Sequence, residues 1–346
     1  MMRKQDENVN VKALDDGYGD TKYDKNGTPE HIPSFVTSFK PKPKDDFSSD
    51  SKLKYIAVEI DGERYVVGDY AMKLDPDIRW NAADHKHSTA NFDILLKTSL
   101  GLMSSGHGEV IDLLMMNLPL KFDTPERRFD LMRAAGGPHE VGISFDGINF
   151  VKKNINVEDV DIKKQGFGSL CDIMLDDVGE ISDRELAKGF NVIVDIGSRT
   201  LNILTVDALE EQQALSTQDN QGMFKSYLQI GRFLEDELGT TIPDGKLPGI
   251  IRAREIRGRD ISQVIDRAYE IHANNIVSTL NTVLLDSWAF VNNVIFTGGG
   301  AEVLAPHLAG KIDRANVLTL GRYSNVRGLR KYGLRSARRN IKRNVR

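Results

Sequence analysis

Cysteine and long apolar runs are almost absent from this sequence. Its 346 residues include one cysteine, Cys171, so no disulfide can form within the chain and a reducing compartment is expected. Apolar runs such as residues 113–116 and 192–196 fall far short of the ~20 residues that a membrane-spanning helix needs. The first nine residues are rich in charge and lack the apolar stretch of a signal peptide. We therefore expect a cytoplasmic protein without a membrane partner.

Several common active-site motifs are also missing. No segment reads G-x-x-x-x-G-K-[ST], so there is no P-loop, and no segment reads H-E-x-x-H or G-x-S-x-G. Gly17-x-Gly19 lacks the third glycine of the dinucleotide fingerprint, because Lys22 stands in its place. P-loop enzymes, dinucleotide oxidoreductases, zinc proteases of this type and α/β hydrolases are therefore disfavoured.

The length and the composition suit a folded protein of two domains. Hydrophobic residues make up 40% and charged residues 28% of the chain, and each domain would hold roughly 170 residues. Predicted strands alternate with predicted helices twice along the chain, which indicates a duplicated α/β architecture. The segments that carry this prediction are strands at 9–14, 110–118, 192–196, 201–206 and 291–297, and helices at 88–103, 125–135, 261–288 and 301–308.

Two turns that contain glycine share one pattern. We call them the first turn, Asp15-x-Gly17-x-Gly19-x-x-Lys22, and the second turn, Asp195-x-Gly197-x-Arg199-x-x-Asn202. Each has an acid at the end of a predicted strand, a glycine two positions later and a polar residue seven positions after the acid. Either turn alone can be a plain hairpin. The matching spacing, repeated 180 residues later, favours a shared function in two lobes.

The chemistry of these turns suits phosphate. Glycine lets backbone N–H groups approach an anion closely. An aspartate repels phosphate, but it can hold Mg²⁺ through water, because Mg²⁺ keeps most of its water shell. A third turn, Gly298-Gly299-Gly300, lies between a predicted strand and a predicted helix, where it can admit a ring or a sugar and offer helix N–H groups to an anion. Together the three turns predict a nucleotide site between two lobes.

In this order, the three turns resemble the actin, Hsp70 and sugar-kinase superfamily, and most of all its ParM-type bacterial and archaeal actins. The segments that carry the resemblance are residues 13–22, 117–121, 195–200, 296–301 and 325–328. The resemblance implies an α/β, actin-like fold of two duplicated, ribonuclease H-like lobes around a nucleotide cleft. Domain I would comprise residues 1–186 with 321–346, and domain II would comprise residues 187–320.

The resemblance also implies roles for single residues. Asp15 and Asp195 match the acids that hold Mg²⁺ through water, and Asp195 also helps to place the attacking water. Gln165 matches a residue between the lobes that orients this water, since a carboxamide is no strong base; the alternative is a solvated loop glutamine. The residues expected to bind ATP or GTP are Gly17, Tyr18, Gly19, Lys22, Gly197, Ser198, Arg199, Gly298, Gly299 and Gly300, with Gly222 as a candidate beside the sugar.

Two positions depart from the family pattern. Asn202 stands where many ParM-like sequences carry an acid, which puts water activation and Mg²⁺ placement in doubt. Arg199 replaces a glycine of eukaryotic actins and adds a charge near the phosphates. Arg199 can bind phosphate or pair with Asp20, and the sequence leaves both open.

The resemblance implies a nucleotide triphosphatase that polymerises into filaments, with hydrolysis following assembly and a DNA-binding adaptor linking the filament to plasmid DNA. The rivals are a small-molecule kinase of the same superfamily and a nucleotide-gated chaperone or scaffold that never polymerises. From Arg322 to Arg346 the chain has ten Lys or Arg and no acid. This tail is expected to be a solvated helix end or a filament contact, and direct contact with nucleic acid or lipid is the less favoured alternative.

Overall fold

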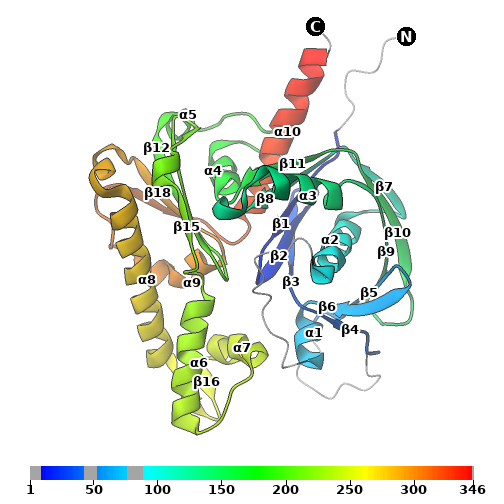
Figure 1. The fold of residues 1–346 in the computed structure, drawn as a ribbon, viewed down its shortest axis with the longest axis horizontal. Helices are drawn as coiled ribbons and strands as arrows, with labels where there is room; N and C mark the ends of the chain where they lie inside the picture. Colours follow the sequence, from blue (N-terminus) through cyan, green and yellow to red (C-terminus); the bar gives the residue numbers. More distant parts are fainter. Residues whose placement is uncertain (1–8, 43–52, 76–88, 345–346) are drawn as a thin grey trace.

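The computed structural model describes residues 9–42, 53–75 and 89–344 (Figure 1). Its first sheet contains the first turn and runs in the order β11-β8-β1-β2-β3. β1 pairs antiparallel with β2 and parallel with β8, so the acid-bearing strand lies at the centre of the sheet. The bounds are Val11–Asp16 for β1, Asp20–Lys25 for β2, Thr28–Pro33 for β3, Leu113–Leu118 for β8 and Val160–Lys164 for β11.

The second sheet repeats this plan around the second turn. It runs in the order β14-β13-β12-β18-β19, and β12 pairs antiparallel with β13 and parallel with β18. The repeated order confirms the duplicated α/β fold. The bounds are Phe190–Ile196 for β12, Leu201–Asp207 for β13, Glu210–Glu211 for β14, Asn293–Thr297 for β18 and Asn316–Thr319 for β19, and β15 (Thr217–Asp219) pairs with β13.

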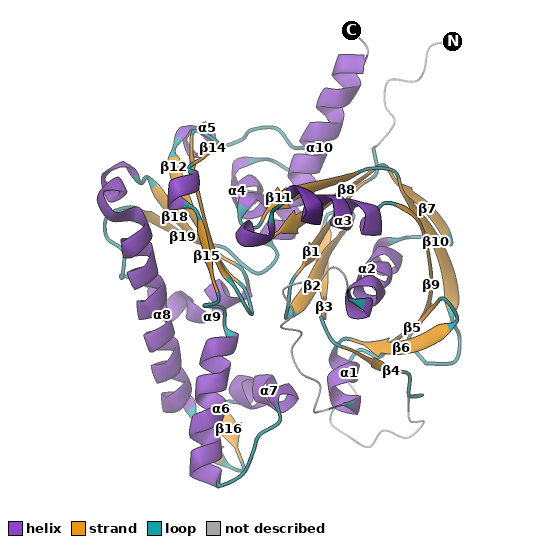
Figure 2. Ribbon diagram, viewed as in Figure 1, coloured by secondary structure: helices purple, strands orange, loops and turns teal. Residues whose placement is uncertain are grey.

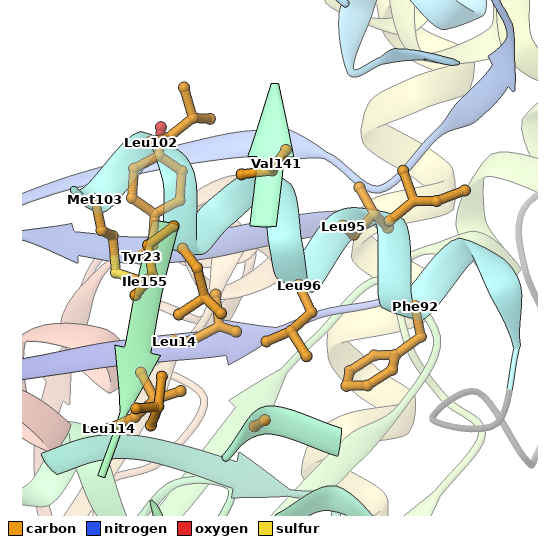
Figure 3. Close-up of a cluster of buried hydrophobic side chains, with 14 of the residues drawn as sticks. Leu14, Tyr23, Phe92, Leu95, Leu96, Leu102, Met103, Leu114, Val141 and Ile155 are labelled. Atoms are coloured by element: carbon orange, nitrogen blue, oxygen red, sulfur yellow. The ribbon is translucent and has the colours of Figure 1, made fainter. Parts of the chain in front are cut away.

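A third sheet encloses helix α2 (Ala90–Met103) against the first sheet, as Figure 2 shows. Thr89 caps this helix, because its side chain accepts a hydrogen bond from the Phe92 N–H. Phe92 and Leu96 pack with Leu14 of β1 in a buried apolar cluster (Figure 3). The sheet runs β4 (Val36–Ser38), β6 (Glu63–Val67), β5 (Ile56–Ile60), β9 (Gly137–Ser144), β10 (Val151–Val157) and β7 (Gly108–Ile111).

Helices cover the second sheet and form the other large core. Apolar side chains of α8 such as Ile265 and Ile276 are buried with Phe296 of β18. The helices are α6 (Phe224–Leu238), α7 (Leu247–Ala253), α8 (Ser262–Leu284) and α9 (Gly299–Leu308), with a hairpin of β16 (Glu255–Ile256) and β17 (Arg259–Asp260). Among the described residues, no helix is both long and apolar enough to span a membrane.

The basic tail forms helix α10 (Ser324–Asn344), which packs on α4 (Phe167–Met174) and β1 (Figure 1). Several of its cations pair with the body of the molecule. Arg327 and Lys331 both bind the Asp172 carboxylate, at 2.6 and 3.1 Å. Arg335 lies 3.3 Å from Glu180. These ion pairs attach the first half of the tail to the body.

The single strand predicted at 110–118 is wrong. β7 ends at Ile111 and β8 begins at Leu113, and the two strands belong to different sheets. Asp112 separates them, and its carboxylate accepts a hydrogen bond from the Asn10 N–H at 2.6 Å. The shorter helices are α1 (Asp69–Leu74), α3 (Pro125–Ala135) and α5 (Arg184–Lys188), and η3 (Leu120–Phe122) follows β8.

Candidate functional site

The three turns meet at one cavity of about 130 Å³. It lies where β1 and β12 end, so residues from both halves of the chain face each other across it. The predicted residues that line it are Asp15, Gly17, Tyr18, Lys22, Gln165, Asp195, Gly197, Ser198, Arg199, Gly298, Gly299 and Gly300. The structure thus brings together nearly all the residues that the sequence singled out.

Gly19 and Gly222 are not among the described residues that line this cavity. A Cβ atom on Gly19 would collide with the Ser198 side chain, so Gly19 is where the first turn touches the second. Gly222 packs behind the second turn, and its N–H donates to the Arg199 carbonyl at 2.9 Å. Gly19 thus leaves room for the Ser198 side chain, and Gly222 permits close contact of two backbone segments behind the second turn.

The first turn holds a buried acid beside a partly buried lysine. Asp15 is 4% exposed, and its Oδ2 accepts a hydrogen bond from Lys22 Nζ at 3.4 Å. Burial alone would lower the pKa of Lys22, but the charges of Asp15, Asp20 and Asp195 raise it above its ordinary value. Lys22 therefore stays cationic in the cavity.

The second turn holds the most perturbed acid of the cavity. Asp195 is 5% exposed, and its Oδ2 accepts a hydrogen bond from Asn325 Nδ2 of α10 at 3.0 Å. Burial, followed by repulsion from Asp15, raises the pKa of Asp195 to about 7, although Lys22 and Asn325 oppose the rise. Two carboxylates that repel each other in a buried site favour a cation between them.

Gln165 enters the cavity at the point where β11 ends. Gly166 follows it with φ of +91°, a value that glycine adopts without strain, and the chain turns there into α4. The Gly166 and Ser169 N–H groups donate to Asn325 Oδ1. Asn325 therefore joins the start of α4 to Asp195, and this link fixes the place of Gln165 relative to that acid.

The third turn lies directly against the second turn. Gly298 has φ of +89°, and a Cβ atom there would come within 2.5 Å of Asp195 Oδ1. Helix α9 begins at Gly299, so its first N–H groups lie at the cavity. Such N–H groups suit an anion or a sugar hydroxyl.

Arg199 and Tyr18 bring the first and second turns into contact. The Arg199 guanidinium lies 4.9 Å from the centre of the Tyr18 ring, within cation–π range. The sequence left open whether Arg199 binds phosphate or pairs with Asp20. In this structure its charge is placed over Tyr18 at the edge of the cavity.

Several residues of the cavity were not predicted as site residues from the sequence. They are Asp20, Thr200, Met223, Phe224, Tyr227, Val303 and Arg322. Arg322 pairs with Glu302 of α9 at 3.1 Å, so its position depends on an acid 20 residues away. Asp20 had appeared only as a partner for Arg199. The repeated pattern of the two turns could have pointed to Thr200, which lies inside the second turn.

The carboxylates fit a cation that is held through water. Asp15 Oδ1 is buried and has no hydrogen-bond partner among the described residues. The described part of the chain contains no group of three or more His, Cys, Asp or Glu side chains that could hold a metal ion directly. Asp15 and Asp195 converge on the cavity, and Asp15 Oδ1 can accept a hydrogen bond from a metal-bound water. This arrangement suits Mg²⁺, which keeps most of its waters and uses few protein ligands.

Comparison with known proteins agrees with this arrangement. Residues 13–168 match the N-terminal domain of actin like proteins, and residues 193–310 match the C-terminal domain of the MreB-like archaeal actin homologue. The chain is 24% identical to the archaeal actin homolog of Thermoplasma acidophilum over 307 residues, which are 85% of this chain and 88% of that relative.

Solved structures show the same fold. The archaeal actin homolog Ta0583 in complex with ADP superposes with a TM-score of 0.75 at 19% identity, over 94% of this chain and 99% of that one. A 15-stranded ParM filament from Clostridium botulinum gives 0.73 at 18% identity, with the same coverage. The chain is therefore an actin-like protein: its two parts match two families of actin-like domains, and it has the actin-like fold of ParM and of archaeal actin homologues.

Proposed function

We propose that this chain is a nucleotide triphosphatase that binds ATP or GTP between the two sheets and polymerises into filaments. The observation that carries the proposal is the convergence of the three turns. Asp15, Asp195 and Gln165, from segments far apart in the sequence, line one cavity with glycines of all three turns. The ADP complex of the similar Ta0583 supports a nucleotide as the ligand.

Catalysis would be positional and electrostatic. Backbone N–H groups of the first and second turns hold phosphate oxygens, and Lys22 neutralises part of their charge. Asp15 and Asp195 would hold Mg²⁺ through its water shell, and this ion would neutralise charge on the phosphates. Gln165 and Asp195 align the attacking water. Because Asn325 holds both Asp195 and the start of α4, this alignment depends on the position of α10.

The size of the cavity supports a cleft that opens and closes. Its volume is about 130 Å³, whereas sites for small molecules usually measure about 300–1,000 Å³. A nucleoside triphosphate therefore enters only when the first and second turns move apart. We propose that nucleotide binding sets the distance between the turns, that this state assembles, and that hydrolysis after assembly weakens the filament.

The wider context belongs to the same proposal. The chain would divide into domain I, residues 1–186 with 321–346, and domain II, residues 187–320. It would act in the cytoplasm, in agreement with its single buried cysteine. Its partners would be further copies of itself and a DNA-binding adaptor that links the filament to plasmid DNA. The similar ParM filament supports self-assembly.

Light scattering with parallel phosphate release tests the proposal. Mg-ATP or Mg-GTP is added across a series of protein concentrations. We expect scattering to rise above a threshold concentration and phosphate to appear afterwards. In the Asp195→Asn variant, phosphate release should be lost. Phosphate release without scattering at any concentration would contradict the filament and favour a kinase, a chaperone or a scaffold.

A further inference from the structure

Asn202 determines which end of the Gln165 side chain faces the cavity. Each of two adjacent carboxamides can be turned in two ways, and their fixed hydrogen-bond partners decide between them. The fixed partner here is the backbone N–H of Leu120, which can only donate. It lies 3.3 Å from Asn202 Oδ1, so the oxygen of the Asn202 side chain must face Leu120.

The orientation of the Asn202 side chain determines the orientation of the Gln165 side chain. With its oxygen towards Leu120, Asn202 donates from Nδ2 to Gln165 Oε1 at 2.8 Å and to Thr200 Oγ1 at 3.2 Å. Asn202 is 1% exposed, so bulk water does not compete for these bonds. Asn202 thus holds the oxygen of Gln165, and Nε2 is the group that Gln165 presents to the cavity.

A donor in this position has the less favourable polarity for hydrolysis, because it aligns the water without accepting one of its hydrogens. The oxygen of the attacking water forms the new bond to the γ-phosphorus, while the bond from that phosphorus to the bridging oxygen breaks and its electron pair stays on the diphosphate. The proton of the water passes to a phosphate oxygen. An N–H group binds one of the two lone pairs of the water oxygen and withdraws electron density from the atom that must attack. A carbonyl oxygen would instead accept a water hydrogen, which raises the electron density on that oxygen and leaves both lone pairs free to face phosphorus.

We propose that Asn202 is a positioning residue that keeps Gln165 in its donor orientation and so slows hydrolysis of the bound triphosphate. This inference rests on the proposed function. In the Asn202→Asp variant, one carboxylate oxygen accepts from Leu120 and the other can accept from Gln165 Nε2. Gln165 would then turn over and present its oxygen to the cavity.

The test compares single-turnover and steady-state phosphate release in the wild type and in Asn202→Asp. We expect kcat to rise at least about tenfold, with nucleotide affinity and KM within about twofold. The rise should disappear in the double variant Asn202→Asp/Gln165→Leu. A purely structural role of Asn202 would lower kcat or weaken binding instead.

Gln218→Glu is the matched control. Gln218 lies opposite Asn202 in the sheet, is 3% exposed and accepts a hydrogen bond from the Lys121 N–H at 2.9 Å. Its substitution adds the same charge one strand away and keeps the bond to the backbone. We expect its kcat to equal that of the wild type. An equal rise in this variant would overturn the inference, because charge alone would explain it.

Gln165→Glu keeps the inference testable if Asn202→Asp does not fold. A glutamate accepts at both oxygens, so one can bind Asn202 Nδ2 while the other faces the cavity. We expect kcat to rise in this variant too. An unchanged or lower kcat in folded, nucleotide-binding Asn202→Asp, or in Gln165→Glu where the first variant is unfolded, would overturn the inference.

Calorimetric titration of the wild type separates this outcome from failure of the proposed function. A wild type that binds nucleotide without turnover, beside an active Asn202→Asp, would support the inference and remove hydrolysis from the native activity. A wild type that binds no nucleotide would contradict the proposed function and therefore also the inference.

Discussion

At the scale of single residues, Asp195 is the acid whose burial most opposes its proposed role. The fold favours its neutral form, whereas holding a cation requires the carboxylate. Burial and the neighbouring Asp15 raise its pKa to about 7 from an ordinary value of 3.8. The folded protein therefore binds a proton there more tightly than the unfolded chain does. This contribution to stability is complete below pH 4 and is lost as the pH rises through 7.

Replacing this acid by its neutral isostere should stabilise the empty protein. In Asp195→Asn, the side-chain oxygen can still accept from Asn325, and no buried charge remains. Without nucleotide and with EDTA, we expect the free energy of unfolding in urea to rise by about 1–3 kcal/mol at pH 8. The difference should shrink to nearly zero at pH 4. A difference that does not depend on pH would contradict this account of Asp195.

How far the site could be predicted also follows from its residues. Asp15 and Asp195 could be paired from sequence, because the repeated spacing of two local turns was visible. The hydrogen bonds of Asn202 to Leu120 and of Asn325 to Asp195 could not, since they join residues 82 and 130 positions apart. A local pattern identifies which residues lie in a turn, but not which distant amide orients them.

At the scale of secondary structure elements, the crossing of α4 and α10 supports the site. Gly168 of α4 and Gly328 of α10 meet there, and their backbones touch because neither has a side chain. Asn325 lies one turn before this contact and binds Asp195. The glycines of the two helices therefore set the depth at which α10 reaches the cavity.

A methyl group at this crossing should be strongly destabilising. In Gly328→Ala, the added Cβ would collide with the Gly168 carbonyl oxygen. We expect a loss of about 3 kcal/mol in the free energy of unfolding, measured in urea. Gly249→Ala in α7 is the control. Apart from the neighbouring backbone of its own helix, no heavy atom of the described residues lies within 4 Å of the added Cβ, so stability should rise by about 0.5–1 kcal/mol. A Gly328→Ala variant as stable as the wild type would show that the helices can separate freely.

The spacing of apolar residues predicted which helices and strands form better than it predicted where they begin and end. The apolar spacing of residues 88–103 predicted helix α2, because that helix is buried between two sheets. The prediction of a single strand at 110–118 was wrong. The largely apolar composition of this segment does not reveal the turn at Asp112, where the chain passes from one sheet to another.

At the scale of the whole molecule, two similar sheets each contribute half of the candidate site. The acid-bearing strands β1 and β12 occupy the same place in the order of their sheets. The Tyr18 and Arg199 side chains connect the two turns across the cavity. The cavity, at about 130 Å³, is smaller than usual small-molecule sites. The proposed nucleotide would therefore change the spacing of these halves on binding, and this coupling would link the nucleotide to assembly.

Titration calorimetry with Mg-ATP and Mg-GTP tests most directly whether the two halves form one nucleotide site. We expect one nucleotide per chain for the wild type. Lys22→Gln in the first half and Asp195→Asn in the second should each weaken that same binding event, by about tenfold or more for the lysine. Two independent binding events, or binding that neither variant changes, would contradict a single site built from both turns.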